Sequence, residues 1–150
     1  MNDAHLHLIL NHLPLTFTLL GLIVLVNGFL FKNEMVKRVA YSVFILAALV
    51  GFVALNTGEG AKDLIEGIKG IDKRIITVHE ETALAFLVFL YILGILSLVG
   101  LWISWQKKSL SKIIGFITIG YLFVIFYYAF QAGVTGAEIR HSEIKKINVK

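Results

Sequence analysis

The sequence predicts an all-α membrane protein, an up-down bundle of four spanning helices. Its 150 residues are 57% hydrophobic and only 16% charged, with a mean hydropathy of +0.81. An average globular chain is about 45–50% apolar and about 25% charged. So little polar surface cannot cover this apolar mass in water. Four long runs also contain no Lys, Arg, Asp or Glu. This predicts one transmembrane domain that covers residues 1–150.

The four apolar runs justify the four helices in order. They cover residues 13–31, 39–55, 83–105 and 113–130. A spanning helix needs roughly 20 mainly apolar residues and at least about 17. The first run is expected to be a retained helix starting near His12-Leu13-Pro14, because no basic segment or cleavage site of a signal peptide precedes it. A long loop is expected over residues 58–78.

The loops suggest an orientation. Residues 32–38 and 107–112 form two short loops dense in Lys and Arg, although the other side has more basic residues in total, mixed with acids. Counting the short loops as cytoplasmic places both termini and the loop 58–78 outside the membrane. The same mixing of charges argues against a nucleic-acid partner.

The chain has no cysteine, which excludes disulfides, iron–sulfur clusters, c-type haem attachment and thiolate zinc sites.

All of the histidines are expected on one side of the bundle. They are His5, His7, His12, His79 and His141. The two halves of the chain also resemble each other, because Thr57-Gly58-Glu59 follows the second run and Thr135-Gly136-Ala137-Glu138 follows the fourth. If the halves are duplicated helical hairpins, His12 at the first helix and His79 at the third occupy facing positions on diagonal helices.

This pattern is compatible with a b-type cytochrome. Two imidazoles on diagonal helices can ligate both faces of a haem iron, and His12 with His79 is the expected axial pair. His7 (or His5) with His141 could hold a second haem, so haem b is expected in one or two copies. Arg140 is expected to neutralise a propionate.

A non-haem metal site is the alternative. Mixed imidazole and carboxylate ligands suit iron, manganese or zinc, and the candidate ligands are His12, Glu59, His79, Glu138 and His141. The depth of His79 favours this alternative, because it lies roughly 8 Å beyond the expected hydrocarbon edge. The third reading is a structural protein or accessory subunit of a membrane complex, with no cofactor. No phosphate-binding loop, nucleophile elbow or other catalytic residue is predicted.

Several short motifs resemble a known family. HLHLILNHLPLTF, TGEG, HEE and TGAEIRH together resemble a family of small four-helix bacterial membrane proteins of uncharacterised function. Ala137 departs from it, because the family has a second glycine there. The match runs over nearly the whole chain, and the matching positions are His7, His12, Pro14, His79, Glu138 and His141.

The resemblance implies electron transfer, because related membrane domains are similar to b-type cytochrome domains and can be fused to c-type cytochrome domains. It also implies the cytoplasmic (inner) membrane of a bacterium. Besides membrane lipid, the expected partners are the quinone pool and an external redox protein. Residues 62–74 are expected to dock that protein, with this chain acting as a small subunit or anchor of a larger membrane complex.

Overall fold

The structure is a computed structural model that describes residues 3–66, 73–106 and 108–140. These residues contain five helices and no strand. The helices are α1 (Asp3–Leu10), α2 (Leu13–Leu30), α3 (Glu34–Glu66), α4 (Lys73–Gln106) and α5 (Lys108–Arg140). The all-α prediction is therefore confirmed.

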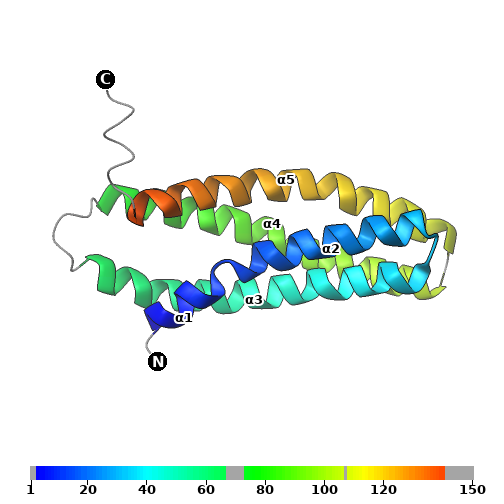
Figure 1. Cartoon of the computed structure of the whole chain (residues 1–150), viewed down its shortest axis with the longest axis horizontal. Coiled ribbons are helices and arrows are strands. Elements are labelled where there is room, and N and C mark those ends of the chain that lie inside the picture. Colours follow the sequence, from blue (N-terminus) through cyan, green and yellow to red (C-terminus); the bar gives the residue numbers. More distant parts are fainter. Residues whose placement is uncertain (1–2, 67–72, 107, 141–150) are drawn as a thin grey trace, which may run out of the picture.

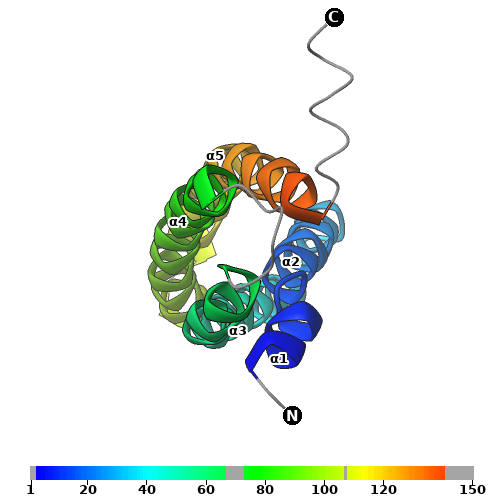
Figure 2. The same ribbon diagram turned by 90° about the vertical axis from the view of Figure 1, so that its left-hand side faces the viewer.

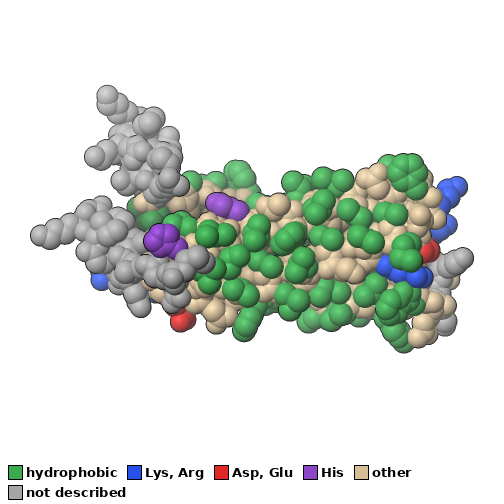
Figure 3. All heavy atoms as spheres, turned by 60° about the horizontal axis from the view of Figure 1, so that its bottom comes forward, with side chains coloured by type: hydrophobic (Ala, Val, Ile, Leu, Met, Phe, Trp, Pro, Cys, Tyr) green, Lys and Arg blue, Asp and Glu red, His purple; other side chains and the backbone are tan. Residues whose placement is uncertain are grey.

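The four long helices run alternately up and down (Figure 1) and follow one another around the bundle in chain order (Figure 2). The short helix α1 packs mainly against α3. Four segments are long and apolar enough to cross a membrane, and the first of them, His5–Leu30, combines α1 with α2. In Figure 3, hydrophobic side chains cover the middle of the face shown, charged side chains lie near its ends, and the histidines gather toward one end. We call this the histidine end.

The long helices extend beyond the apolar runs. Helices α3, α4 and α5 contain 33, 34 and 33 residues, which is roughly 50 Å each against a hydrocarbon core of about 30 Å. The expected loop over 58–78 is wrong for 58–66 and 73–78, which are helical. Ala61, Ile75 and Ile76 are buried there, because the packed core continues past the polar residues that end the apolar runs.

The first span is broken where Pro14 follows α1. Helix α1 ends at Leu10 and α2 begins at Leu13, close to the predicted start. Proline has no backbone N–H, so it cannot donate to the carbonyl of Leu10 as a continuous helix would require. The break separates α1 from the direction of α2 and allows α1 to lie on α3 (Figure 1).

Glycines let large side chains pass between the helices. Tyr41 and Phe44 on α3 are fully buried. A Cβ atom at Gly100 would lie 2.6 Å from Cζ of Tyr41, and a Cβ at Gly21 would overlap the ring of Phe44. Small residues at such contacts allow close backbone approach, which is how membrane helices associate without a hydrophobic driving force.

The two halves of the bundle repeat each other. Buried positions of α2 match buried positions of α4, and those of α3 match those of α5. The pairs include Pro14 with Phe86, Thr18 with Leu90, Leu25 with Ser97, Ala40 with Thr118, Phe44 with Leu122, and Ala47 with Ile125. The burial pattern therefore supports two related hairpins, α1–α2–α3 and α4–α5.

We expect Gly100→Ala to lower the free energy of unfolding by about 1–3 kcal/mol, because the new methyl group would collide with the enclosed ring of Tyr41. Gly120→Ala is the matched control. Nothing lies within 4 Å of the Cβ that it would add, so its better helix propensity should stabilise the chain by up to about 1 kcal/mol. Thermal unfolding in detergent measures both, and equal shifts would contradict the packing argument.

Candidate functional site

His7 is held between α1 and α3 at the histidine end. Its Nδ1 lies 3.0 Å from the carbonyl oxygen of Ala54 and 3.4 Å from Oγ1 of Thr57. Gly58 leaves room for the ring, because a Cβ atom there would lie 3.4 Å from Cε1 of His7. One turn of α3 therefore provides two hydrogen-bond acceptors and a space for the imidazole.

His79 is held in the same way between α4 and α5. Its Nδ1 lies 3.2 Å from Oγ1 of Thr135, and the backbone of Ala132 lies beside the ring. A Cβ atom at Gly136 would lie 3.0 Å from Cε1 of His79. Thr82 supports the arrangement, because its Oγ1 lies 2.8 Å from Oγ1 of Thr135.

The two sites are equivalent under the internal repeat. Each has an alanine carbonyl, then a threonine hydroxyl and a glycine on the following turn, all around one imidazole. The first set is Ala54, Thr57 and Gly58 around His7, and the second is Ala132, Thr135 and Gly136 around His79. The repeat thus places two similarly held histidines at the same end of the bundle.

The hydrogen bonds fix which nitrogen of His7 carries the proton. A carbonyl oxygen can only accept, so Nδ1 of His7 donates to Ala54. The hydroxyl of Thr57 is directed at the carbonyls of Val53 and Ala54 on its own helix, and it therefore accepts from Nδ1 as well. A neutral imidazole protonated at Nδ1 has its lone pair on Nε2.

The same argument holds for His79. The hydroxyl of Thr135 lies within hydrogen-bond distance of the carbonyls of Gln131 and Ala132. When it donates to one of them, it accepts the proton of Nδ1 of His79. Each imidazole then keeps Nε2 for a metal. A histidine that ligates a metal usually donates its other N–H to a carbonyl, a carboxylate or water.

His12 lies elsewhere. It is exposed at the break between α1 and α2, and its side chain makes no capping hydrogen bond. The expected equivalence of His12 with His79 is therefore wrong, because the counterpart of His79 in the repeat is His7. The sequence offered both histidines, but the helix break caused by Pro14 decides which of them faces α3.

The predicted carboxylate ligands do not gather around the histidines. Glu59 is exposed and Glu138 is half-buried, and the part of the chain that the structure describes has no cluster of three or more His, Asp or Glu that could hold a metal ion. Glu80, next to His79, pairs with Lys62 at 2.8 Å. His141 lies outside the described residues, as does the side chain of Arg140.

Sequence reasoning missed the site residues Thr57, Thr135, Gly58 and Gly136. Their signal was present, since the Thr-Gly pair recurs in both halves. Glycine commonly terminates helices, so a Thr-Gly pair after an apolar run indicates a helix end more readily than a binding site. In the structure both pairs lie inside continuous helices, and their role is to receive the imidazoles.

Comparison with protein-family models, with curated proteins and with solved structures finds no match for this chain. The resemblance to a cytochrome-like membrane family remains a prediction. The internal geometry is thus the basis for a functional proposal.

We expect Gly136→Ala to displace the imidazole of His79 and weaken its hydrogen bond to Thr135, because the added Cβ would lie 3.0 Å from the ring. Gly133→Ala is the matched control on the same helix, since nothing lies within 4 Å of its Cβ. Nitrogen-15 NMR of the histidine side chains in detergent reports on Nδ1 directly. Unchanged His79 signals in Gly136→Ala would contradict the assigned packing.

Proposed function

We propose that this chain is a membrane electron-transfer protein, a b-type cytochrome with one haem b ligated by His7 and His79. The observation that carries the proposal is the pair of imidazoles at equivalent positions of the repeat, each with Nδ1 beside a threonine hydroxyl of a facing helix, and for His7 also beside the carbonyl of Ala54. Bis-histidine ligation uses this donor set. When bound, haem b supplies a one-electron redox couple.

The donor chemistry favours haem over a non-haem ion. Iron, manganese and zinc sites of the type expected from the sequence need carboxylates beside the imidazoles. No such group of acids and histidines is assembled among residues 3–66, 73–106 and 108–140. Two neutral nitrogen ligands without carboxylates match the two axial positions of a porphyrin-bound iron.

The length of the helices removes the objection from depth. The sequence placed His79 beyond the hydrocarbon edge, where a haem would be exposed to water. The bundle continues past that edge, with Ala61, Ile75 and Ile76 buried beyond the apolar runs. Apolar side chains around a redox site limit water access and lower the local dielectric, and both affect the reduction potential.

Each hairpin contributes one ligand and its own support. Thr57 and Thr135 hold the imidazoles in a fixed rotation, and Gly58 and Gly136 accept the rings at close range. These residues are positioning residues, since they act through the histidines. Histidine, threonine and glycine can hold the cofactor in this way without a charged side chain, which agrees with the high free-energy cost of charged groups in a membrane.

We propose the cellular setting on the basis of the loops and the family resemblance. The histidine end would face outside in a bacterial cytoplasmic membrane. There the protein would exchange electrons between the quinone pool and an external redox protein or a larger membrane complex. The segment proposed to dock that partner, residues 62–74, lies partly outside the described residues.

We expect His7→Ala and His79→Ala each to abolish haem absorbance, because each removes one axial ligand. His12→Ala is the control and should keep the absorbance, since His12 is exposed and takes no part in the hydrogen bonds that hold His7 and His79. The measurement is a reduced-minus-oxidised visible spectrum of the purified protein in detergent, with iron analysis of the same sample.

The alanine variants could lose haem because they unfold and not because a ligand is missing. The variant His79→Met distinguishes these two causes. Methionine is also an axial haem ligand, so this variant should retain haem with a shifted spectrum and a more positive potential. A wild-type protein that folds without haem after expression with ample haem would sink the proposal. A cofactor-free accessory subunit would then be the better account.

We expect Thr57→Val and Thr135→Val to weaken haem retention by roughly 10-fold or more, as the loss of a hydrogen bond to a ligating histidine typically does at metal sites. Loss of the hydroxyl lowers the electron donation of the imidazole, so the reduction potential should become more positive. Redox titration with haem-transfer kinetics measures both. Thr16→Val serves as control, because Thr16 bonds only the His12 carbonyl on the exposed side of α2. If both Thr57→Val and Thr135→Val keep the wild-type reduction potential, the positioning roles assigned to these threonines are wrong.

A further inference from the structure

A basic cavity lies at the end of the bundle opposite the histidines. Its volume is about 480 Å³, and it lies where α2, the turn that follows it, α3 and α5 meet. It is lined by Phe29, Lys32, Glu34, Lys37, Ser109 and Lys112. Three of the six residues are lysines and one is an acid, so the lining carries a net positive charge.

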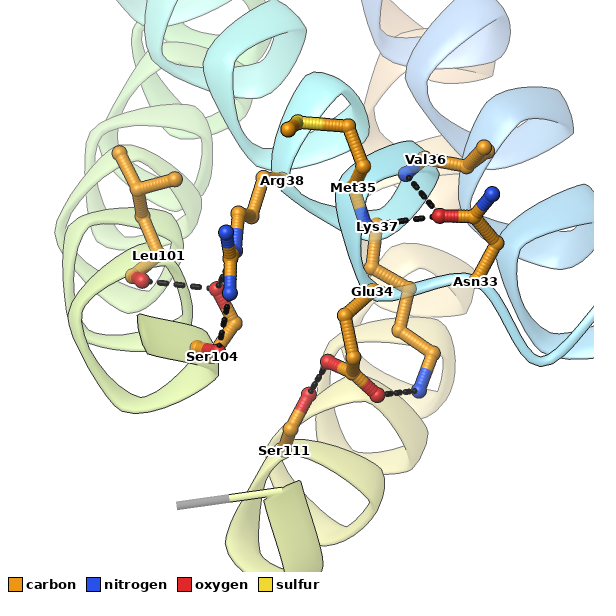
Figure 4. A network of polar contacts seen from close by, with 9 residues as sticks. All are labelled: Asn33, Glu34, Met35, Val36, Lys37, Arg38, Leu101, Ser104 and Ser111. Atoms are coloured by element: carbon orange, nitrogen blue, oxygen red, sulfur yellow. Dashed lines mark hydrogen bonds and ion pairs between the residues drawn. The ribbon is translucent and has the colours of Figure 1, made fainter. Parts of the chain in front are cut away.

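The single acid of this cavity is already neutralised. Lys37 is only 2% exposed, and its Nζ lies 2.8 Å from Oε1 of Glu34 (Figure 4). Ser111 donates to the other carboxylate oxygen at 2.6 Å, and Nζ of Lys37 lies 4.5 Å from the centroid of the Phe29 ring. Both oxygens of Glu34 are therefore engaged.

Two lysines at the cavity remain without a counter-charge. Within the described part of the chain, no ion pair is formed by Lys32 or Lys112, and both residues are exposed. A cavity whose lining combines two uncompensated lysines with the ring of Phe29 attracts an anion that can also contact hydrocarbon.

The apolar neighbours of these lysines set their level in the membrane. Phe31 is 74% exposed directly before Lys32, and Ile113 is 57% exposed directly after Lys112. Exposed side chains of this kind mark the hydrocarbon edge, and long basic side chains next to them reach the headgroup level. The cavity therefore opens where lipid phosphates lie.

Lys32 occupies a backbone conformation that normally favours glycine. Its φ is +50°, and the bonds Lys32 N–H to Phe29 C=O and Asn33 N–H to Gly28 C=O close the end of α2 around it. This helix ending usually has glycine at the left-handed position, because other residues pay a steric cost. Lysine at this left-handed position strains the backbone, but it places a positive charge at the cavity.

We propose that this cavity binds the phosphate of an anionic phospholipid, with Lys32 and Lys112 as its charged ligands. The lipid would join the α2–α3 turn to α5. These two parts otherwise meet through few contacts, among them the rings of Phe29 and Phe116, whose centroids are 4.7 Å apart. Bound lipid should thus stabilise the closure of the bundle between α2 and α5. The proposal is independent of the haem.

The test measures how phosphatidylglycerol raises the thermal unfolding midpoint of the detergent-solubilised chain, with phosphatidylcholine as the neutral lipid. Wild-type protein should be stabilised by phosphatidylglycerol alone. Lys32→Gln with Lys112→Gln should weaken the apparent affinity about 30-fold, because each basic residue near an anionic headgroup contributes about 1 kcal/mol and about 1.4 kcal/mol corresponds to a tenfold change. Lys73→Gln with Arg74→Gln makes the same charge change at the histidine end and should leave the affinity unchanged.

A second variant separates charge from folding. Lys32→Gly relieves the left-handed strain, so it should raise the midpoint without lipid and reduce the additional rise with phosphatidylglycerol. Inorganic phosphate at matched concentration should not reproduce the lipid effect. Equal stabilisation of the lysine variants and wild type would overturn the site, and equal stabilisation by inorganic phosphate would overturn the assignment to lipid.

Discussion

Close contact between helices at small residues is the constraint on which the rest of this bundle depends. Lipid gives no hydrophobic reason for helices to associate, so packing must hold them together. Gly100 admits Tyr41, Gly21 admits Phe44, and at the histidine end Gly58 and Gly136 admit imidazoles. The same device thus serves stability in the middle of the bundle and the candidate site at its end. In both places a glycine on one helix accepts a ring from its neighbour.

The polar side chains of the bundle form most of their hydrogen bonds within a single helix. Most hydroxyl groups bond to carbonyls of their own helix, as Thr18 does with Pro14 and Thr118 with Ile114. Most hydrogen bonds between helices lie at the two ends of the bundle, and one in its middle runs from the hydroxyl of Tyr121 to the carbonyl of Phe89. At one end threonines hold the histidines, and at the other Glu34, Lys37 and Ser111 join α3 to α5. Buried polar groups in such a medium need partners, and the chain places these partners beyond or at the edges of its apolar runs.

The sequence was sufficient for the fold class, because four uncharged runs of membrane length have few alternative structures. It was also sufficient for the sidedness of the described histidines, which follows from an up-down order. The sequence was insufficient to predict where the helices end and which histidine is the counterpart of His79 in the repeat. Hydropathy reports where the apolar run stops, whereas helices α3 and α4 continue because Ala61 and Ile75 still pack. The choice between His7 and His12 depends on how Pro14 redirects the chain, and spacing alone does not contain that information.

The broken first span makes the two halves mechanically unequal. His79 belongs to a helix of 34 residues, whereas His7 belongs to one of eight residues that rests on α3. Local opening requires little more than the loss of the contacts between α1 and α3, while moving His79 would disturb a whole span. Under the proposed function, His7 would therefore be the more easily displaced of the two histidines, and His79 would be the permanent anchor. Two sites that look symmetric would thus differ in how readily each one opens.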